Sequence, residues 1–198
     1  MIKIIKNSFL ILLLFLLPYC DQPLESKNTS KTSNNIVTVK VFSSLTCPHC
    51  ADFHNKIFEN LNKDFINPGK VIFEHHSFPL DLAALNAEKL LHCNDKNKID
   101  FQFLGEIYKK QNEWAVGSDI KKINNSLKNL SEKFGLSDAQ MIKCLGDENL
   151  EEYILNQRVQ SQKNYKISST PTIYINEKKY EGKINYKSFK KVIEKYQK

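Results

Sequence analysis

IVTVKVF at residues 36–42, followed by Cys47-Pro48-His49-Cys50, is the most informative part of this sequence. The β-branched run predicts a strand, and the amphipathic stretch from Ala51 to Phe65 predicts a helix. At the start of a helix, backbone N–H groups and the helix dipole stabilise a thiolate on Cys47. Pro48 suits the first helical turn, where its missing N–H has no partner to lose. The strand–CxxC–helix unit therefore indicates a redox-active dithiol.

Residues 1–20 have the pattern of an export signal. Lys3 and Lys6 precede an apolar run from Phe9 to Leu17, and this run is too short to span a membrane comfortably. We therefore expect the domain to lie outside the cytoplasmic membrane, in the periplasm.

Cys20 is a candidate site of lipidation. Leu17 lies three residues before it, as in a bacterial lipoprotein signal, but Pro18 and Tyr19 occupy positions where small residues are usual. Ordinary cleavage is an alternative, although no small-x-small site lies nearby. An uncleaved anchor is the third alternative, and either lipid or anchor would tether the chain to the membrane through its N-terminus.

The basic residues do not indicate a nucleic-acid groove. The chain has 29 Lys and Arg against 22 Asp and Glu, a formal net charge of +7, but its single arginine is Arg158. The lysines are dispersed among glutamates and asparagines, whereas nucleic-acid grooves usually combine Arg with stacked aromatics on one face. We interpret the charge as a solvated surface and expect no nucleic-acid partner.

The order of predicted elements is β-α-β, a helical block, then β-β-α. The polar residues 21–35 predict a flexible linker, and the domain spans residues 36–198. Two strands joined by one crossover helix should be parallel. The outer strands need each other to complete a sheet, so we interpret the helical block, at about residues 80–166, as an insertion. The predicted strands are 36–43, 70–78, 171–175 and 178–181, and the predicted helices are 48–65, 82–92, 99–114, 120–134, 137–145, 150–165 and 186–196.

Three segments of this chain resemble the DsbA family of thiol:disulfide oxidoreductases. They are residues 44–50 (SLTCPHC), 78–81 (FPLD) and 169–175 (STPTIYI). The resemblance implies an α/β thioredoxin-like fold with a helical insertion between the second and third strands. The family oxidises thiols of exported proteins, and a Pro-His dipeptide between the cysteines is typical of its oxidising members.

The resemblance also implies roles for individual residues. Cys47 would be the exposed nucleophile and Cys50 the buried resolving thiol, and His49 would help to lower the thiol pKa. Pro171 would be cis and lie beside the dithiol, and Thr170 would offer backbone groups to an extended substrate peptide. The plain alternatives are a solvated histidine and an ordinary turn proline.

One position departs from the family pattern. The family commonly has a buried acid on the strand before the dithiol, and here Val41 occupies that position. A missing acid would remove a proton shuttle for Cys50. Glu74 or one of His75 and His76 could substitute, and only one histidine can reach the site because adjacent strand residues point to opposite faces. Surface histidines are the alternative.

Cys93 and Cys144 both fall in the helical block. Cysteines outside the active site usually pair in an oxidising compartment. With Cys47–Cys50 and Cys93–Cys144 as two disulfides, Cys20 would be the one unpaired cysteine, and a lipid would modify it. We predict a structural, non-catalytic disulfide, and the alternative is two buried free thiols.

We therefore expect an enzyme that donates the Cys47–Cys50 disulfide to thiols of exported proteins. By the resemblance, a membrane partner of the DsbB type, linked to quinone, would reoxidise it. We expect a monomer without a cofactor or a bound metal. The alternatives are a disulfide reductase or isomerase, a copper- or metal-binding module that uses Cys47, Cys50 and His54, and a catalytically idle binding domain.

Overall fold

The computed structural model describes residues 35–93, 95 and 98–198. The predicted export signal, the linker up to residue 34 and Cys20 lie outside the described residues. Within the described ranges, no helix is both long and apolar enough to cross a membrane.

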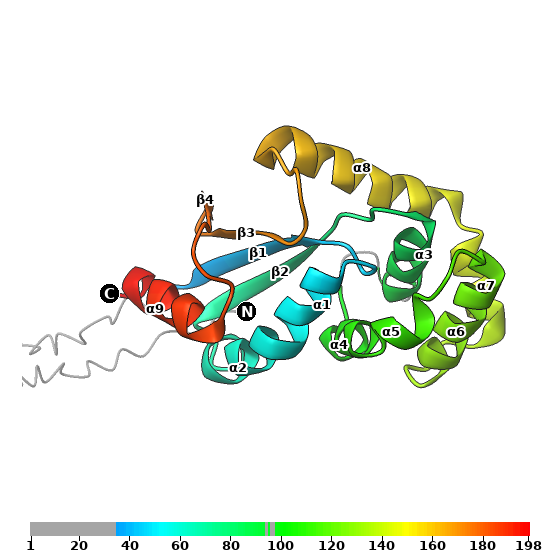
Figure 1. The fold of residues 1–198 in the computed structure, drawn as a ribbon, viewed down its shortest axis with the longest axis horizontal. Helices are drawn as coiled ribbons and strands as arrows, with labels where there is room; N and C mark the ends of the chain where they lie inside the picture. The colour runs from blue at the N-terminus through cyan, green and yellow to red at the C-terminus, as the bar shows by residue number, and fades with distance from the viewer. Residues whose placement is uncertain (1–34, 94, 96–97) are drawn as a thin grey trace, which may run out of the picture. The chain divides into compact units, whose positions relative to one another are not determined.

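Four strands of the described chain form one mixed sheet in the order β2-β1-β3-β4 (Figure 1). Strand β1 (Val37–Ser43) runs parallel to β2 (Val71–Ser77), as the single crossover helix predicts. Strand β3 (Thr172–Ile175) pairs antiparallel with β1 and with the short β4 (Lys178–Lys179). The chain thus leaves the sheet after β2 and returns to its middle after the helical block, which confirms the predicted insertion.

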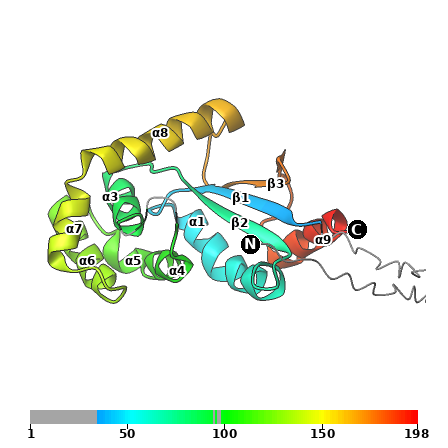
Figure 2. The same ribbon diagram turned by 180° about the vertical axis from the view of Figure 1, so that it is seen from behind.

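One face of the sheet is covered by the crossover segment and by α9 (Tyr186–Tyr196) (Figures 1 and 2). A single helix is predicted for the crossover, whereas the structure interrupts it with two π-helical turns. It comprises α1 (Pro48–Phe53), η1 (His54–Phe58), α2 (Glu59–Leu61) and η2 (Asn62–Ile66). Buried side chains of this layer, Phe53 and Phe189 among them, pack on Val39 and Val41 of β1.

The opposite face is covered by α8 (Glu148–Tyr165) (Figure 1). Here β1 presents Phe42, whose ring centroid lies 4.8 Å from that of Tyr165. Lys40 points the same way and donates a hydrogen bond of 3.0 Å to the Tyr165 hydroxyl. Alternate side chains of β1 therefore point to two faces that are both covered by helices. The α8 face tolerates Lys40 because its ammonium group has polar partners.

The insertion forms a second core beside the first turn of α1. Leu45, Cys47, Cys50 and Ala51 share one buried cluster with residues of the inserted helices. Most of these helices begin after an Asp or Ser whose side chain accepts a backbone N–H, and Ser137 and Gln140 form a capping box. The inserted helices are α3 (Leu82–Leu91), α4 (Phe101–Lys109), α5 (Gln111–Trp114), α6 (Ile120–Glu132), α7 (Asp138–Leu145) and α8.

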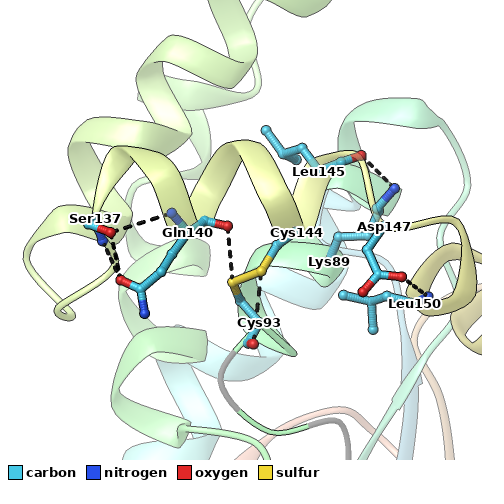
Figure 3. The surroundings of a disulfide bond; sticks show 8 residues. All are labelled: Lys89, Cys93, Ser137, Gln140, Cys144, Leu145, Asp147 and Leu150. Atoms are coloured by element: carbon cyan, nitrogen blue, oxygen red, sulfur yellow. Dashed lines mark hydrogen bonds between the residues drawn. A yellow bond between two sulfur atoms is a disulfide. The ribbon is translucent and has the colours of Figure 1, made fainter.

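A disulfide joins Cys93, just after α3, to Cys144 on α7 (Figure 3). The two Cα atoms lie 5.6 Å apart, and 51 residues separate the cysteines in sequence. This geometry supports the predicted structural role, since the bond links two inserted helices.

Truncating the buried face of α9 should destabilise the domain. Ile193 is 0% exposed, whereas Ile142 on α7 is 73% exposed. We expect Ile193→Ala to lower the free energy of unfolding by about 2–5 kcal/mol, because it leaves a cavity in the core. The matched control, Ile142→Ala, should change it by less than about 0.5 kcal/mol. Urea denaturation measures both, and equal effects would contradict the assigned core.

Removing the second disulfide should cost stability and leave the dithiol chemistry intact. For a separation of 51 residues, the chain-entropy model gives about 4 kcal/mol. We expect the double variant Cys93→Ala/Cys144→Ala to unfold at a lower urea concentration and still oxidise thiols through Cys47. Free thiols at both positions in the mass spectrum of the native exported protein would contradict the pairing.

Candidate active site

The dithiol lies at the start of α1, where the sequence places it. Cys47 is the N-cap residue and Pro48 follows in the first helical turn. The Cys47 carbonyl accepts hydrogen bonds from the N–H groups of Cys50 and Ala51, both at 3.1 Å. The first turn of the helix is thereby closed around the two thiols.

Both cysteines are free thiols in this structure, and both are largely covered. The Cys50 side chain is 1% exposed and Cys47 is 7% exposed. The expected order of exposure is right, but the description of Cys47 as exposed needs correction. Its sulfur lies against Thr170, whose carbonyl oxygen is 3.4 Å from Sγ, and only Pro48 and His49 of the tetrad are exposed.

The two thiols have opposite electrostatic environments. A hydrogen bond from the Cys50 side chain is the largest cause that lowers the pKa of Cys47, to about 5. Burial opposes this shift, and the Thr170 side chain and the backbone amides of Cys50 and His49 add to it. Burial, followed by its bond to Cys47, raises the pKa of Cys50. One sulfur is therefore a thiolate at neutral pH while the other keeps its proton.

His49 contributes to the site differently from the prediction. Among the groups that lower the pKa of Cys47, it acts through its backbone amide. Its imidazole is exposed and lines a groove of about 460 Å³ with Asp52, Lys56 and the Thr170-Pro171 segment. The ring is thus placed to meet whatever occupies this groove.

The peptide bond between Thr170 and Pro171 is cis, as the resemblance implies. This loop precedes β3 and contacts Cys47 through Thr170. Thr170 and Pro171 are half-buried and line the groove beside the dithiol. The loop and the helix start together form one reactive surface.

Gln111 and Asp81 hold the active-site turn, and the sequence did not reveal the role of either residue. The Gln111 side chain on α5 donates to the carbonyls of Leu45, at 2.8 Å, and Cys47, at 3.1 Å. Asp81 accepts a bond of 2.7 Å from the Thr46 hydroxyl and also caps α3. A buried glutamine has no sequence signature, whereas Asp81 before an apolar helical run could have been recognised as a cap.

A buried polar cluster lies behind the dithiol. The cavity at this cluster is lined by Val41 of β1, the position at which the family commonly has an acid, so β1 supplies no acid there. Of the two candidate histidines, His75 reaches this cavity, and its ring is 3.0 Å from Glu88 of α3. Sequence reasoning missed Glu88, because a lone glutamate on an apolar helix is usually exposed.

Glu74 and His76 do not substitute for the missing acid. They lie on the other face of β2, where they bond each other at 2.8 Å. His76 also stacks on Phe42, with ring centroids 4.7 Å apart. The prediction that Glu74 or His76 could replace the acid is therefore wrong, because adjacent strand residues point to opposite faces and only His75 faces the dithiol.

The metal-binding alternative gains no support from the described part of the chain. There, no group of three or more His, Cys, Asp and Glu side chains is arranged to hold a metal ion. His54 is buried and stacks on Phe58 at a centroid distance of 4.3 Å. Burial lowers the pKa of His54 to about 3, so its ring is a neutral member of the core.

Comparison with known proteins agrees with this geometry. Residues 32–195 match the family model described as Thioredoxin. The chain is 30% identical over 171 residues to disulfide bond formation protein D of Bacillus subtilis, covering 80% of this chain and 72% of that protein. The crystal structure of Wolbachia pipientis alpha-DsbA1 aligns with a TM-score of 0.73 at 25% identity, covering 82% of this chain and 86% of that chain.

The chain therefore belongs to the thioredoxin family. Its CxxC pair at the helix start and its insertion between β2 and β3 make it a DsbA-like member. A Rickettsia bellii protein provisionally named as a protein-disulfide oxidoreductase is 28% identical over 143 residues, covering 72% of this chain. That match covers 54% of the relative, so the chain spans about half its length.

The thiolate of Cys47 should be visible in a pH titration. Absorbance at 240 nm of the reduced protein should rise with a midpoint near pH 5, against about 8.5 for an ordinary thiol. Because folding lowers this pKa, the thiolate stabilises the reduced protein fully above about pH 8.5. That stabilisation should decrease as the pH falls towards 5. Cys47→Ser should abolish the transition, and a midpoint above pH 8 would contradict the assigned environment.

Proposed function

We propose that this protein is a thiol:disulfide oxidoreductase that donates the Cys47–Cys50 disulfide to thiols of exported proteins. The observation that carries the proposal is the contrast between the two sulfurs. The pKa of Cys47 is lowered to about 5 while that of its neighbour Cys50 is raised. A stable thiolate is a good leaving group, and it favours the reduced form of the enzyme, which makes the disulfide a strong oxidant.

The reaction takes two exchange steps. A substrate thiolate attacks the Cys47 sulfur, the Cys47–Cys50 bond breaks, and Cys50 leaves and takes up a proton. A second substrate thiolate then attacks the substrate sulfur of the mixed disulfide, and Cys47 leaves as a thiolate. The substrate loses two electrons and gains a disulfide, while the enzyme becomes a dithiol.

The groove beside the dithiol is the proposed substrate site. Thr170 and Pro171 line it together with the exposed His49 and Ile184. An extended peptide lying along this loop would bring its cysteine to the Cys47 sulfur and could bond to the Thr170 backbone. The mixture of apolar and polar lining suits peptides of varied sequence.

We propose that the protein acts outside the cytoplasm, in the periplasm. This proposal rests on residues 1–20, which have the pattern of an export signal, and on the resemblance to the DsbA family, which oxidises thiols of exported proteins. A membrane partner of the DsbB type, linked to quinone, is the proposed reoxidant. It would accept the two electrons that Cys47 and Cys50 gain in each cycle.

A reductase or isomerase is the second candidate. Val41 in place of a buried acid favours it, since the acid influences the dithiol of the family and its loss could shift the potential. The direction of the reaction depends on the reduction potential, because the same exchange steps run either way.

A redox titration distinguishes the two directions. Purified residues 21–198 would be equilibrated with glutathione buffers, and Cys47–Cys50 oxidation followed by thiol alkylation. We expect a potential well above that of the glutathione couple, together with oxidation of a reduced, unfolded test protein. Cys47→Ser should abolish this oxidation, whereas the exposed-surface control Ile142→Ala should not affect it. A potential near that of thioredoxin would favour the reductase or isomerase.

A further inference from the structure

Burial of Cys50 restricts the exchange of its proton with solvent. Its side chain is 1% exposed, and each opening of the disulfide converts it to a thiolate that must acquire a proton. Each closing requires the proton to leave again, because only the thiolate attacks. A buried thiol exchanges protons with bulk water poorly, so a nearby acid–base group is needed for rapid turnover.

A small cavity connects Cys50 to titratable groups of the interior. Its volume is about 10 Å³, close to the space that one water needs. Cys50, Ser43 and His75 line it, together with Tyr108 and His54. Among the described residues, the Tyr108 hydroxyl is one of two buried side-chain polar atoms without a hydrogen-bond partner. A water here would have polar groups to bond.

His75 lines this cavity and pairs with Glu88, which lies behind it. The His75 side chain is 2% exposed and the Glu88 side chain 0%. Nδ1 of His75 is 3.2 Å from the Ser43 hydroxyl, and Nε2 is 3.0 Å from Oε1 of Glu88. With the proton on Nε2, the ring donates to the carboxylate and Nδ1 can accept from Ser43.

Glu88 is held as a carboxylate by its surroundings. Burial opposes the charged form, but the His75 ring, His92 and a bond of 2.7 Å from the Ser77 hydroxyl lower the pKa of Glu88 overall. A buried carboxylate beside a histidine stabilises the imidazolium form, as in catalytic triads. The pair can therefore take up a proton without leaving an isolated charge in the core.

We propose that His75, supported by Glu88, accepts and returns the proton of Cys50 through the Ser43 hydroxyl and the small cavity. This inference rests on the proposed function, and it assigns to β2 and α3 the shuttle that Val41 cannot provide. His75 acts through Ser43 and the cavity, so it and Glu88 are positioning residues for proton transfer.

The proton is passed between His75 and Cys50 both when the Cys47–Cys50 disulfide opens and when it closes. When a substrate opens the disulfide, Cys50 leaves as a thiolate and receives the proton that the His75 imidazolium held. When a disulfide oxidant has formed a mixed disulfide with Cys47, the Cys50 thiol gives its proton to Nδ1 of His75. The Cys50 thiolate then attacks the Cys47 sulfur, the enzyme disulfide forms, and the oxidant leaves as a thiolate carrying two electrons.

The groups that set the pH dependence come from every element around His75. They are Cys50 on α1, His54 on η1, Tyr108 on α4, Glu88 on α3 and His92 at the C-cap of α3. His54 and Tyr108 stay neutral at ordinary pH, because burial lowers the pKa of the first to about 3 and raises that of the second. The His75–Glu88 pair and Cys50 are therefore the groups between which the proton moves.

The test isolates the step in which the Cys50 thiol loses its proton and attacks the mixed disulfide. Reduced full-length protein is mixed with oxidised glutathione, quenched with acid and analysed by mass spectrometry, which resolves the Cys47–glutathione intermediate from the final disulfide. We expect His75→Gln to slow resolution of the intermediate about 100-fold near pH 6.5, at the lower end of general acid–base effects. Its rate should then rise with hydroxide concentration, and Glu88→Gln should show a smaller effect of the same kind.

The matched control is His76→Gln. His76 is the next residue on β2, but it lies on the opposite face against Phe42. This variant should resolve the intermediate at the wild-type rate at every pH. If His75→Gln folds, by circular dichroism, and has the same pH profile as His76→Gln, the proposal is wrong.

A measurement on the unaltered protein covers the case in which His75→Gln fails to fold. The wild-type resolution rate should reach a plateau as the pH rises and fall about two-fold or more in D₂O, because a proton moves in the slow step. A wild-type rate that increases in proportion to hydroxide from pH 5 to 9 would overturn the proposal. Failure of the proposed function has a different signature, a Cys47–Cys50 potential near that of thioredoxin in the glutathione titration, which does not depend on the rate at which the intermediate resolves.

Discussion

The hydrogen bond between the two active-site sulfurs is the interaction on which the rest of the site depends. In it Cys50 keeps its proton and donates, and Cys47 accepts, so the bond favours the thiolate form of Cys47. That division is stable only if Cys50 is buried and Cys47 meets donors, which are the Cys50 side chain, the Thr170 side chain and the amides at the helix start. The fold supplies both conditions from segments far apart in sequence, since Thr170 precedes β3 and the amides follow β1.

Burial of Cys50 in turn explains why the insertion belongs to the site. The inserted helices share one apolar cluster with the dithiol and contribute Tyr108 to the cavity behind it. Glu88 comes from the same block and meets His75 of the sheet. A block that resembles an appendage in the sequence is thus one wall of the reactive centre.

The fold could be predicted from sequence because its signals are local. The β-branched run of β1 and the CxxC pair each depend on neighbours along the chain, and α9 has the predicted bounds. The partners of the site could not be predicted in this way. Gln111 and Glu88 are recognised only by what they touch, and those contacts join residues separated by 66 and 13 positions. Strand alternation predicted that one of two histidines would face the dithiol, but not that a glutamate on α3 would meet it.

The two bonds from Gln111 to the carbonyls of Leu45 and Cys47 bear on how such proteins diversify. They tie the backbone of the reactive turn to α5, while Asp81 ties Thr46 to the start of α3. The helical block therefore cannot be replaced independently of the reactive turn that it holds. A chimaera that takes this block from a relative would keep the shape of the reactive turn only if the incoming block brings an equivalent donor and an equivalent cap. Changes in the block and changes in the CxxC loop are consequently expected to have been inherited together.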